Sequence, residues 1–165
     1  MKVKFNNLFH GHKKIQNQLI KSFKQHLKNS DFIGGSEVLR FENNFKKLNE
    51  SKHCVSCANG SDALVIAIKA LGLKPGDEVI TTAFSWIATS AAITLAGGKV
   101  VFCDIEKDTM CIDPVSLEKK ISKFTKFILV VHWGGNAGNL NQIIKIAKKY
   151  NLKIIEDASH SPGHS

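Results

Sequence analysis

The stretch that decides the fold is NLKIIEDASHS, residues 151–161. It is largely apolar from Leu152 to Ile155 and then places Glu156 and Asp157 where a strand would end. Short apolar runs are typical of strands that are buried on both faces of a parallel sheet. A carboxylate at the end of such a strand needs a cationic or hydrogen-bonding partner. We therefore predict a strand over 153–156 and an acidic group, Asp157, that faces a cleft.

Further β-rich runs precede this strand, and helical patterns separate them. The strands are expected at 53–58, 78–82, 99–103 and 126–132, and the helices at 61–71, 86–96, 114–121 and 139–150. Asp113 and Pro114 suit the N-cap and the first position of the third of these helices. Strands that alternate with helices imply right-handed crossovers. The predicted fold is therefore α/β, a mostly parallel sheet with helices on both faces.

Residues 1–50 have a different pattern and are expected to form a helical arm before the α/β domain of 51–165. One helix is predicted over 12–28 and a second from Ser36. Their apolar residues recur at helical spacing, which indicates one buried stripe on each helix. These stripes consist of Ile15, Leu19, Ile20, Phe23 and Leu27, and of Val38, Phe41, Phe45 and Leu48.

The composition limits the classes of function. The net charge is +9, but only Arg40 of the 23 basic residues is arginine, and the lysines are scattered, which argues against nucleic-acid binding. The sequence shows no apolar run long enough for a membrane span and no signal peptide, so we expect a cytoplasmic protein with reduced cysteines. Cys54 and Cys57 would point to opposite faces of the strand predicted there, which argues against a zinc site.

Ligands of parallel sheets gather at the carboxyl ends of the strands, and three stretches there carry candidate residues. In the first, a strand is followed by Asn59-Gly60-Ser61-Asp62 and then by a helix. Gly60 permits close approach of the backbone, Ser61 adds a hydroxyl, and the helix N-terminus supplies N–H donors for a phosphate. The alternative is that Ser61 or Asp62 only caps the helix.

The second and third stretches contain an aromatic ring and a carboxylate. Trp86 lies where a strand passes into a helix, so its ring could stack on a planar heteroaromatic ligand, although a buried core tryptophan is the alternative. Asp157 could pair with a protonated ring nitrogen, or instead with a lysine or a helix end. His160 could donate a hydrogen bond to the same ligand, or simply be exposed.

Together these stretches resemble the DegT/StrS-type sugar aminotransferases, which are pyridoxal 5'-phosphate (PLP) enzymes of the aspartate-aminotransferase fold. The resemblance rests on GGSEVLRFENNF (34–45), ANGSDALVIAIKALGLKPGDEVITTAFSWIAT (58–89), GGKVVFCDIEKDTMCIDP (97–114), VVHWGGNAGNLNQI (130–143) and KIIEDASHSPG (153–163). It implies that Gly60, Ser61 and Asp62 bind the cofactor phosphate and that Trp86 lies against the ring. It also implies that Asp157 pairs with the ring nitrogen and His160 lies near the ring hydroxyl.

The resemblance further implies a reaction and its partners. An amino donor, usually glutamate, would load the cofactor, which would then aminate a keto sugar linked to a nucleotide, in a homodimer. The family's Schiff-base lysine lies downstream of the stretch at 153–163, so we expect this chain to be the N-terminal part of such an enzyme. A sugar dehydratase of the same family and a non-catalytic binding module are the alternatives. A Rossmann-type nucleotide domain is disfavoured because no G-x-G-x-x-G follows the first strand.

Overall fold

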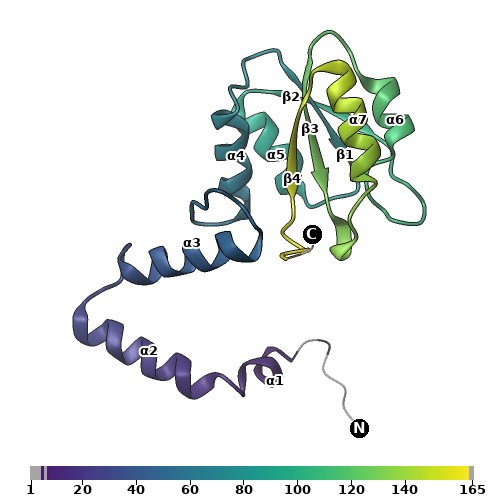
Figure 1. Ribbon diagram of the computed structural model, residues 1–165. Helices are drawn as coiled ribbons and strands as arrows, with labels where there is room; N and C mark the ends of the chain where they lie inside the picture. The colour runs from purple at the N-terminus through teal and green to yellow at the C-terminus, as the bar shows by residue number, and fades with distance from the viewer. Residues whose placement is uncertain (1–4, 6, 164–165) are drawn as a thin grey trace. The chain divides into compact units, whose positions relative to one another are not determined.

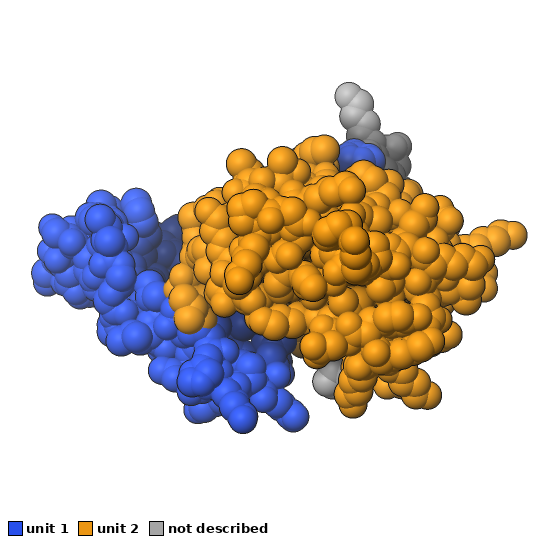
Figure 2. Space-filling model, turned by 90° about the horizontal axis from the view of Figure 1, so that it is seen from above, with its two compact units in different colours: residues 1–54 blue, residues 55–165 orange. Residues whose placement is uncertain are grey.

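The computed structural model describes residues 5 and 7–163, and the chain divides into two compact units, residues 1–54 and 55–165 (Figures 1 and 2). The second unit contains a four-stranded parallel sheet in the order β2-β1-β3-β4. Its strands are β1 (Glu78–Thr82), β2 (Lys99–Cys103), β3 (Thr125–Val131) and β4 (Lys153–Asp157). Its helices are α4 (Gly60–Ala70), α5 (Ile87–Ala96), α6 (Pro114–Lys120) and α7 (Leu140–Tyr150).

Two hydrophobic clusters hold the sheet between its helices. Alternate strand residues point to opposite faces, so Phe127 and Leu129 join the cluster under α4 and α5, whereas Ile128 and Val130 join the one under α6 and α7 (Figure 1). All four of these side chains are at most 3% exposed, which is why β3 is apolar throughout. The predicted α/β class, with a parallel sheet covered on both faces, is confirmed.

Local signals fix two helix boundaries, of which the start of α6 was predicted. Asp113 caps α6 by accepting from the N–H groups of Val115 and Ser116, at 3.0 and 3.1 Å, and Pro114 takes the first helical position. After the last residue of α5, Gly97 adopts a left-handed conformation (φ 98°) that ends this helix and leads into β2.

The strand predicted at 53–58 is wrong, because this segment is irregular in the structure. Val55 is 84% exposed, and no described strand pairs with the segment. A strand forms by hydrogen bonding to a neighbour, and β-rich composition does not supply one. The opposite-face argument for Cys54 and Cys57 therefore loses its basis, although no cluster of three or more metal-ligating side chains occurs among the described residues.

The first unit consists of helices whose predicted apolar stripes are not buried. Its helices are α1 (Leu8–His12), α2 (Gln16–Asn29) and α3 (Ser36–Leu48). The helix predicted over 12–28 is thus observed as α2, which begins four residues later, and the short helix α1 precedes it. None of their residues is buried, and Phe23 and Phe41 are 62% and 56% exposed. Amphipathic spacing shows which face of a helix is apolar, but burial needs a second surface to cover it.

None of the helices in the described part of the chain is long and apolar enough to cross a membrane.

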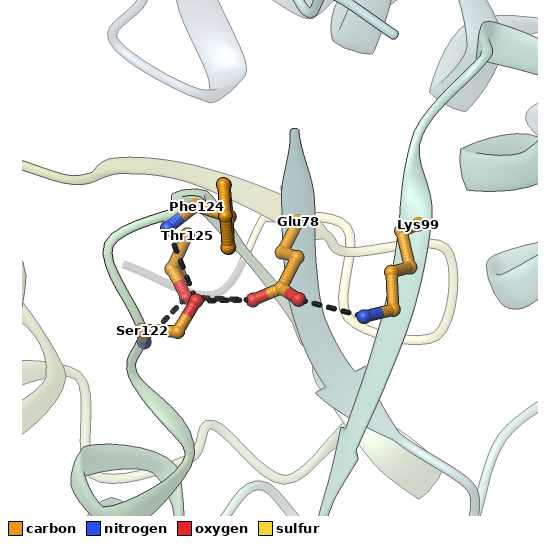
Figure 3. A network of polar contacts seen from close by, with 5 residues as sticks. All are labelled: Glu78, Lys99, Ser122, Phe124 and Thr125. Carbon is orange, nitrogen blue, oxygen red and sulfur yellow. Dashed lines mark hydrogen bonds and ion pairs between the residues drawn. The ribbon is translucent and has the colours of Figure 1, made fainter. Parts of the chain in front are cut away.

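A hydrogen-bonded network closes the amino end of the sheet (Figure 3). The Glu78 carboxylate, on a side chain 8% exposed, accepts from Lys99 Nζ at 3.0 Å and from Ser122 Oγ at 2.5 Å. Thr125 Oγ1 lies 3.5 Å from the same carboxylate, beside the register shift between β1 and β3. The hydrogen bond from Ser122 and the contact with Lys99 hold the pKa of Glu78 below its ordinary value, against the opposing effect of burial.

Candidate functional site

The site lies between β1 and β3, where the chain changes the direction in which it adds strands to the sheet. From β1 the chain passes through α5 to β2 on one side, and from β3 it passes through α7 to β4 on the other. Right-handed crossovers in opposite directions put α5 and α7 on opposite faces, which opens a crevice at the carboxyl ends of the two central strands.

A cavity of about 220 Å³ occupies this position. Its lining comes from the start of α4, the turn between β1 and α5, the end of β3 and the end of β4. An apolar cavity of about 150 Å³ is known to hold benzene, so this one can admit a single substituted aromatic ring. Among the predicted site residues, Gly60, Ser61, Trp86, Asp157 and His160 all line it.

The N-terminus of α4 forms one wall of the cavity. Asn59 caps the helix through its side-chain oxygen, which accepts from the Asp62 N–H at 2.9 Å. The N–H groups of Gly60 and Ser61 come earlier in the same turn, where a helix offers no acceptor of its own. A β-carbon built on Gly60 would lie 3.6 Å from Ser159 Oγ, an ordinary van der Waals distance, so the start of α4 lies close to the loop after β4. This wall suits an anion.

Asp62 does not lie with the other predicted residues. It is not in the cavity lining, and its carboxylate accepts from the Asn59 side-chain nitrogen at 2.9 Å. Asp62 and Asn59 therefore bond to each other reciprocally, although the second bond uses the Asn59 side chain and not its backbone N–H as a capping box would. The contact of Asp62 with a ligand therefore stays a prediction. The alternative, that Ser61 or Asp62 caps the helix, is wrong, because the N-cap is Asn59.

Trp86 is an exposed residue of the cavity rim and not a core tryptophan. Its side chain is 73% exposed, and it is the residue immediately before α5. The turn that carries it is held by Ser85 and Thr89, whose hydroxyls lie 2.8 Å apart, and Thr89 is buried. A large ring kept in water at the mouth of a cavity is available to cover a flat ligand.

Asp157 ends β4 and turns its carboxylate into the following loop. Its Oδ1 accepts from both the N–H and the hydroxyl of Ser159, at 3.1 and 2.5 Å. No ion pair of Asp157 occurs among the described residues, so neither a lysine nor a helix end satisfies its charge. The remaining acceptor capacity of the carboxylate is open to a cationic group in the cavity.

His160 belongs to a group of rings that joins three loops. Its ring lies 5.4 Å from that of Trp133, which in turn makes an edge contact with Phe84 at 4.9 Å. His160 Nδ1 accepts from the Gly134 N–H at 3.3 Å, so the neutral ring carries its proton on Nε2. That Nε2–H is a donor that the described contacts do not use.

Sequence reasoning missed several residues of the lining. His132 and Trp133 follow β3, Ser85 and Thr89 flank Trp86, and Ser159 supports Asp157. The rule that ligands gather at the carboxyl ends of strands points to these positions, but it does not say which side chains turn inward.

The cavity lining contains no lysine among the described residues. Lys153, at the amino end of β4, donates from Nζ to the Leu71 carbonyl at 2.7 Å and lies at the opposite end of the strand from Asp157. The chain therefore offers the cavity an anion-binding helix end, an exposed aromatic ring and an unpaired carboxylate. This combination is suited to a planar, cationic heterocycle that carries a phosphate.

Comparison with known proteins identifies the family. Residues 13–165 match the DegT/DnrJ/EryC1/StrS aminotransferase family, and the chain belongs to it. The UDP-2-acetamido-2-deoxy-3-oxo-D-glucuronate aminotransferase of Pseudomonas aeruginosa is 38% identical over 163 residues, which are 99% of this chain and 45% of that protein. The predicted resemblance to sugar aminotransferases is confirmed.

Solved structures agree with this assignment. DesV of S. venezuelae, solved in complex with a ketimine intermediate, superposes with a TM-score of 0.94 at 30% identity, over 98% of this chain and 44% of DesV. NtdA of Bacillus subtilis, solved with the bound cofactor PMP, superposes with a TM-score of 0.90 at 36% identity, over 92% of this chain and 35% of NtdA. The chain thus spans less than half the length of the relatives it matches.

Proposed function

We propose that this chain binds PLP in the cavity and serves an aminotransferase that aminates a keto sugar linked to a nucleotide, for polysaccharide or secondary-metabolite biosynthesis. One observation carries the proposal: the Asp157 carboxylate and the N-terminus of α4 line the same cavity, with Trp86 at its rim. A phosphate-bearing pyridinium needs an anion site, a counter-charge and a flat contact, and these three groups supply them.

The described residues fit the cofactor as follows. The N–H groups of Gly60 and Ser61 and the Ser61 hydroxyl would hold the phosphate, and Trp86 would cover the ring. Asp157, steadied by Ser159, would keep a proton on the ring nitrogen. When bound, PLP supplies an electron sink for the substrate carbon that loses a proton, and the paired carboxylate strengthens that sink. His160 would donate from Nε2 to an oxygen of the cofactor.

The partners of the complete reaction belong to the same proposal. Glutamate is the proposed amino donor, and the family resemblance places the Schiff-base lysine after the stretch at 153–163. A second copy of the chain is the proposed partner in a cytoplasmic homodimer. The exposed apolar faces of α2 and α3 support this, since Phe23 and Phe41 are more than half exposed.

Cofactor binding can be tested without the lysine. The chain has two tryptophans, Trp86 and Trp133, and both line the cavity, so intrinsic fluorescence reports its occupancy. We expect saturable quenching by pyridoxamine 5'-phosphate and weaker quenching by pyridoxamine, which lacks the phosphate. Asp157→Asn should raise the dissociation constant by about 10- to 100-fold, which corresponds to the loss of a charged hydrogen bond.

Asp108→Asn is the matched control, because Asp108 lies in an exposed loop outside the cavity lining. It should leave the affinity unchanged. Failure of the wild-type chain to bind the phosphorylated compound, or equal affinities for wild type and Asp157→Asn, would contradict the proposal. In a protein that also contains the segment with the family's lysine, amination, dehydration or neither would then separate the aminotransferase from the dehydratase and from a binding module.

A further inference from the structure

His132 is bonded twice to the end of β4. It directly follows β3, and its N–H donates to the Asp157 carbonyl at 3.1 Å, which extends the parallel ladder by one residue. Its Nε2 lies 3.1 Å from the Glu156 carboxylate. His132 thus contacts both residues at which β4 ends, Asp157 through its main chain and Glu156 through its side chain. Asp157 is the one that lines the cavity.

The environment of the imidazole fixes its tautomer. The ring is buried, lines the cavity and is held at Nε2 by a carboxylate that is half-exposed. An ionised carboxylate only accepts hydrogen bonds, so Nε2 of the neutral ring carries the proton. Nδ1 is then left with a lone pair and acts as an acceptor.

This acceptor is buried and has no hydrogen-bond partner among the described residues. Unpartnered buried polar atoms are rare in folded proteins, because each one loses its hydration without compensation. The only other such side-chain atom in the described chain is Ser161 Oγ, four residues after Asp157. Both belong to segments that follow β3 and β4 at the carboxyl end of the sheet, and His132 lines the cavity there.

We propose that His132 is a positioning residue of the cofactor site: it holds the end of β4 so that Asp157 faces the cavity, and its Nδ1 accepts a hydrogen bond from the bound cofactor or from a water that the cofactor traps. The second half of the proposal rests on the proposed function, whereas the first half concerns the chain alone. An apolar side chain of similar volume would fill the position without leaving an unpaired atom, so packing does not account for a histidine there.

Three variants separate these roles. His132→Phe keeps the ring volume and removes both nitrogens. His132→Gln keeps a donor for Glu156 without restoring the imidazole, and it also serves if the phenylalanine variant does not fold. His53→Phe is the matched control, since His53 is exposed in the irregular segment before α4.

The first readout is amide hydrogen exchange of the ligand-free chain at Ser159, whose N–H donates to Asp157 Oδ1. We expect exchange to be roughly tenfold faster in His132→Phe, because this variant loses one hydrogen bond that fixes the loop. Exchange should be nearly unchanged in His132→Gln and His53→Phe. Equal exchange in wild type and His132→Phe would overturn the positioning role, whatever the chain binds.

The second readout is binding of pyridoxamine 5'-phosphate, followed by tryptophan fluorescence and by the circular dichroism induced in the cofactor band. Both His132 variants should bind about tenfold more weakly, with a changed induced signal, while His53→Phe matches wild type. A general loss of stability would lower the melting temperature without altering the signal of the bound fraction. If wild type binds and both His132 variants bind with the same affinity and signal, the inference alone is overturned. If wild type does not bind, the proposed function is overturned.

Discussion

The two ends of the same parallel sheet are built in opposite ways. At the amino end, the buried Glu78 carboxylate finds partners in Lys99, Ser122 and Thr125, all supplied by this chain (Figure 3). At the carboxyl end, His132 Nδ1 is buried without a partner, and Asp157 has no ion pair among the described residues. The contrast supports the proposal that a ligand completes the polar groups at the carboxyl end, whereas folding alone completes those at the amino end.

The largest effect expected from this contrast is on stability at the amino end. Glu78→Ala leaves the hydroxyls of Ser122 and Thr125 without their shared acceptor, so the free energy of unfolding should fall by about 1–3 kcal/mol. Urea denaturation measures this change. Glu118→Ala is the matched control, because Glu118 also accepts from a lysine and a hydroxyl but is 38% exposed. An equal loss in the control would show that the Glu78 network has no special role.

A second prediction uses the pH dependence of the same carboxylate. The folded state lowers the pKa of Glu78 below its ordinary value of 4.5, mainly through the Ser122 hydrogen bond. The stabilisation is therefore complete above the unfolded-state pKa and is lost as the pH falls through the folded-state pKa. Between neutral pH and the acid range, wild type should lose more unfolding free energy than Glu78→Gln. Parallel curves for the two proteins would contradict the assignment.

The opposite behaviour is expected at the carboxyl end. Trp86 is 73% exposed, so Trp86→Ala should change the free energy of unfolding by less than about 0.5 kcal/mol. The same substitution should weaken pyridoxamine 5'-phosphate binding several-fold, measured by calorimetry, because it removes the flat contact. A large loss of stability with unchanged affinity would assign Trp86 to the core and would remove the contrast between the two ends.

The smallest effect concerns a thiol that lies outside the cavity lining. Cys103 ends β2, and burial, followed by the charges of Asp104 and Asp113, raises the pKa of its thiol to about 12. Because the thiolate is the reactive form, a thiol reagent should modify Cys103 only as the chain unfolds, and exposed Cys57 first. Mass spectrometry after timed labelling gives the order. Rapid labelling of Cys103 would show that the sheet opens beyond the cavity.

The sequence predicts most of the sheet because local patterns decide it. Ile80 and Ile128 lie in apolar runs too short for helices and bounded by turn residues, and these runs became β1 and β3. Asp113 and Pro114 mark a helix start through chemistry that involves only their own neighbours. Segment 53–58 has a composition typical of strands, but a strand also needs a neighbouring strand to pair with. None of the described strands pairs with this segment.

The site is predictable to a smaller extent. Trp86 and Asp157 follow from the rule about strand ends, whereas Gly60 follows only from the helix that begins there, because the strand predicted before it does not form. The structure brings all three together. Asp62 was expected at the ligand but bonds to Asn59, which is the N-cap although only Ser61 and Asp62 were considered for that role from the sequence. His132 has no local signal at all, since its importance rests on an unpaired nitrogen that only the tertiary structure reveals.

The most direct test of the account is a crystal structure of this chain with pyridoxamine 5'-phosphate. We expect the phosphate against the N–H groups of Gly60 and Ser61, and the ring nitrogen within hydrogen-bonding distance of the Asp157 carboxylate. A phosphate bound elsewhere, or an Asp157 side chain turned away from the ring, would contradict the claim that the open end of the sheet is completed by this cofactor.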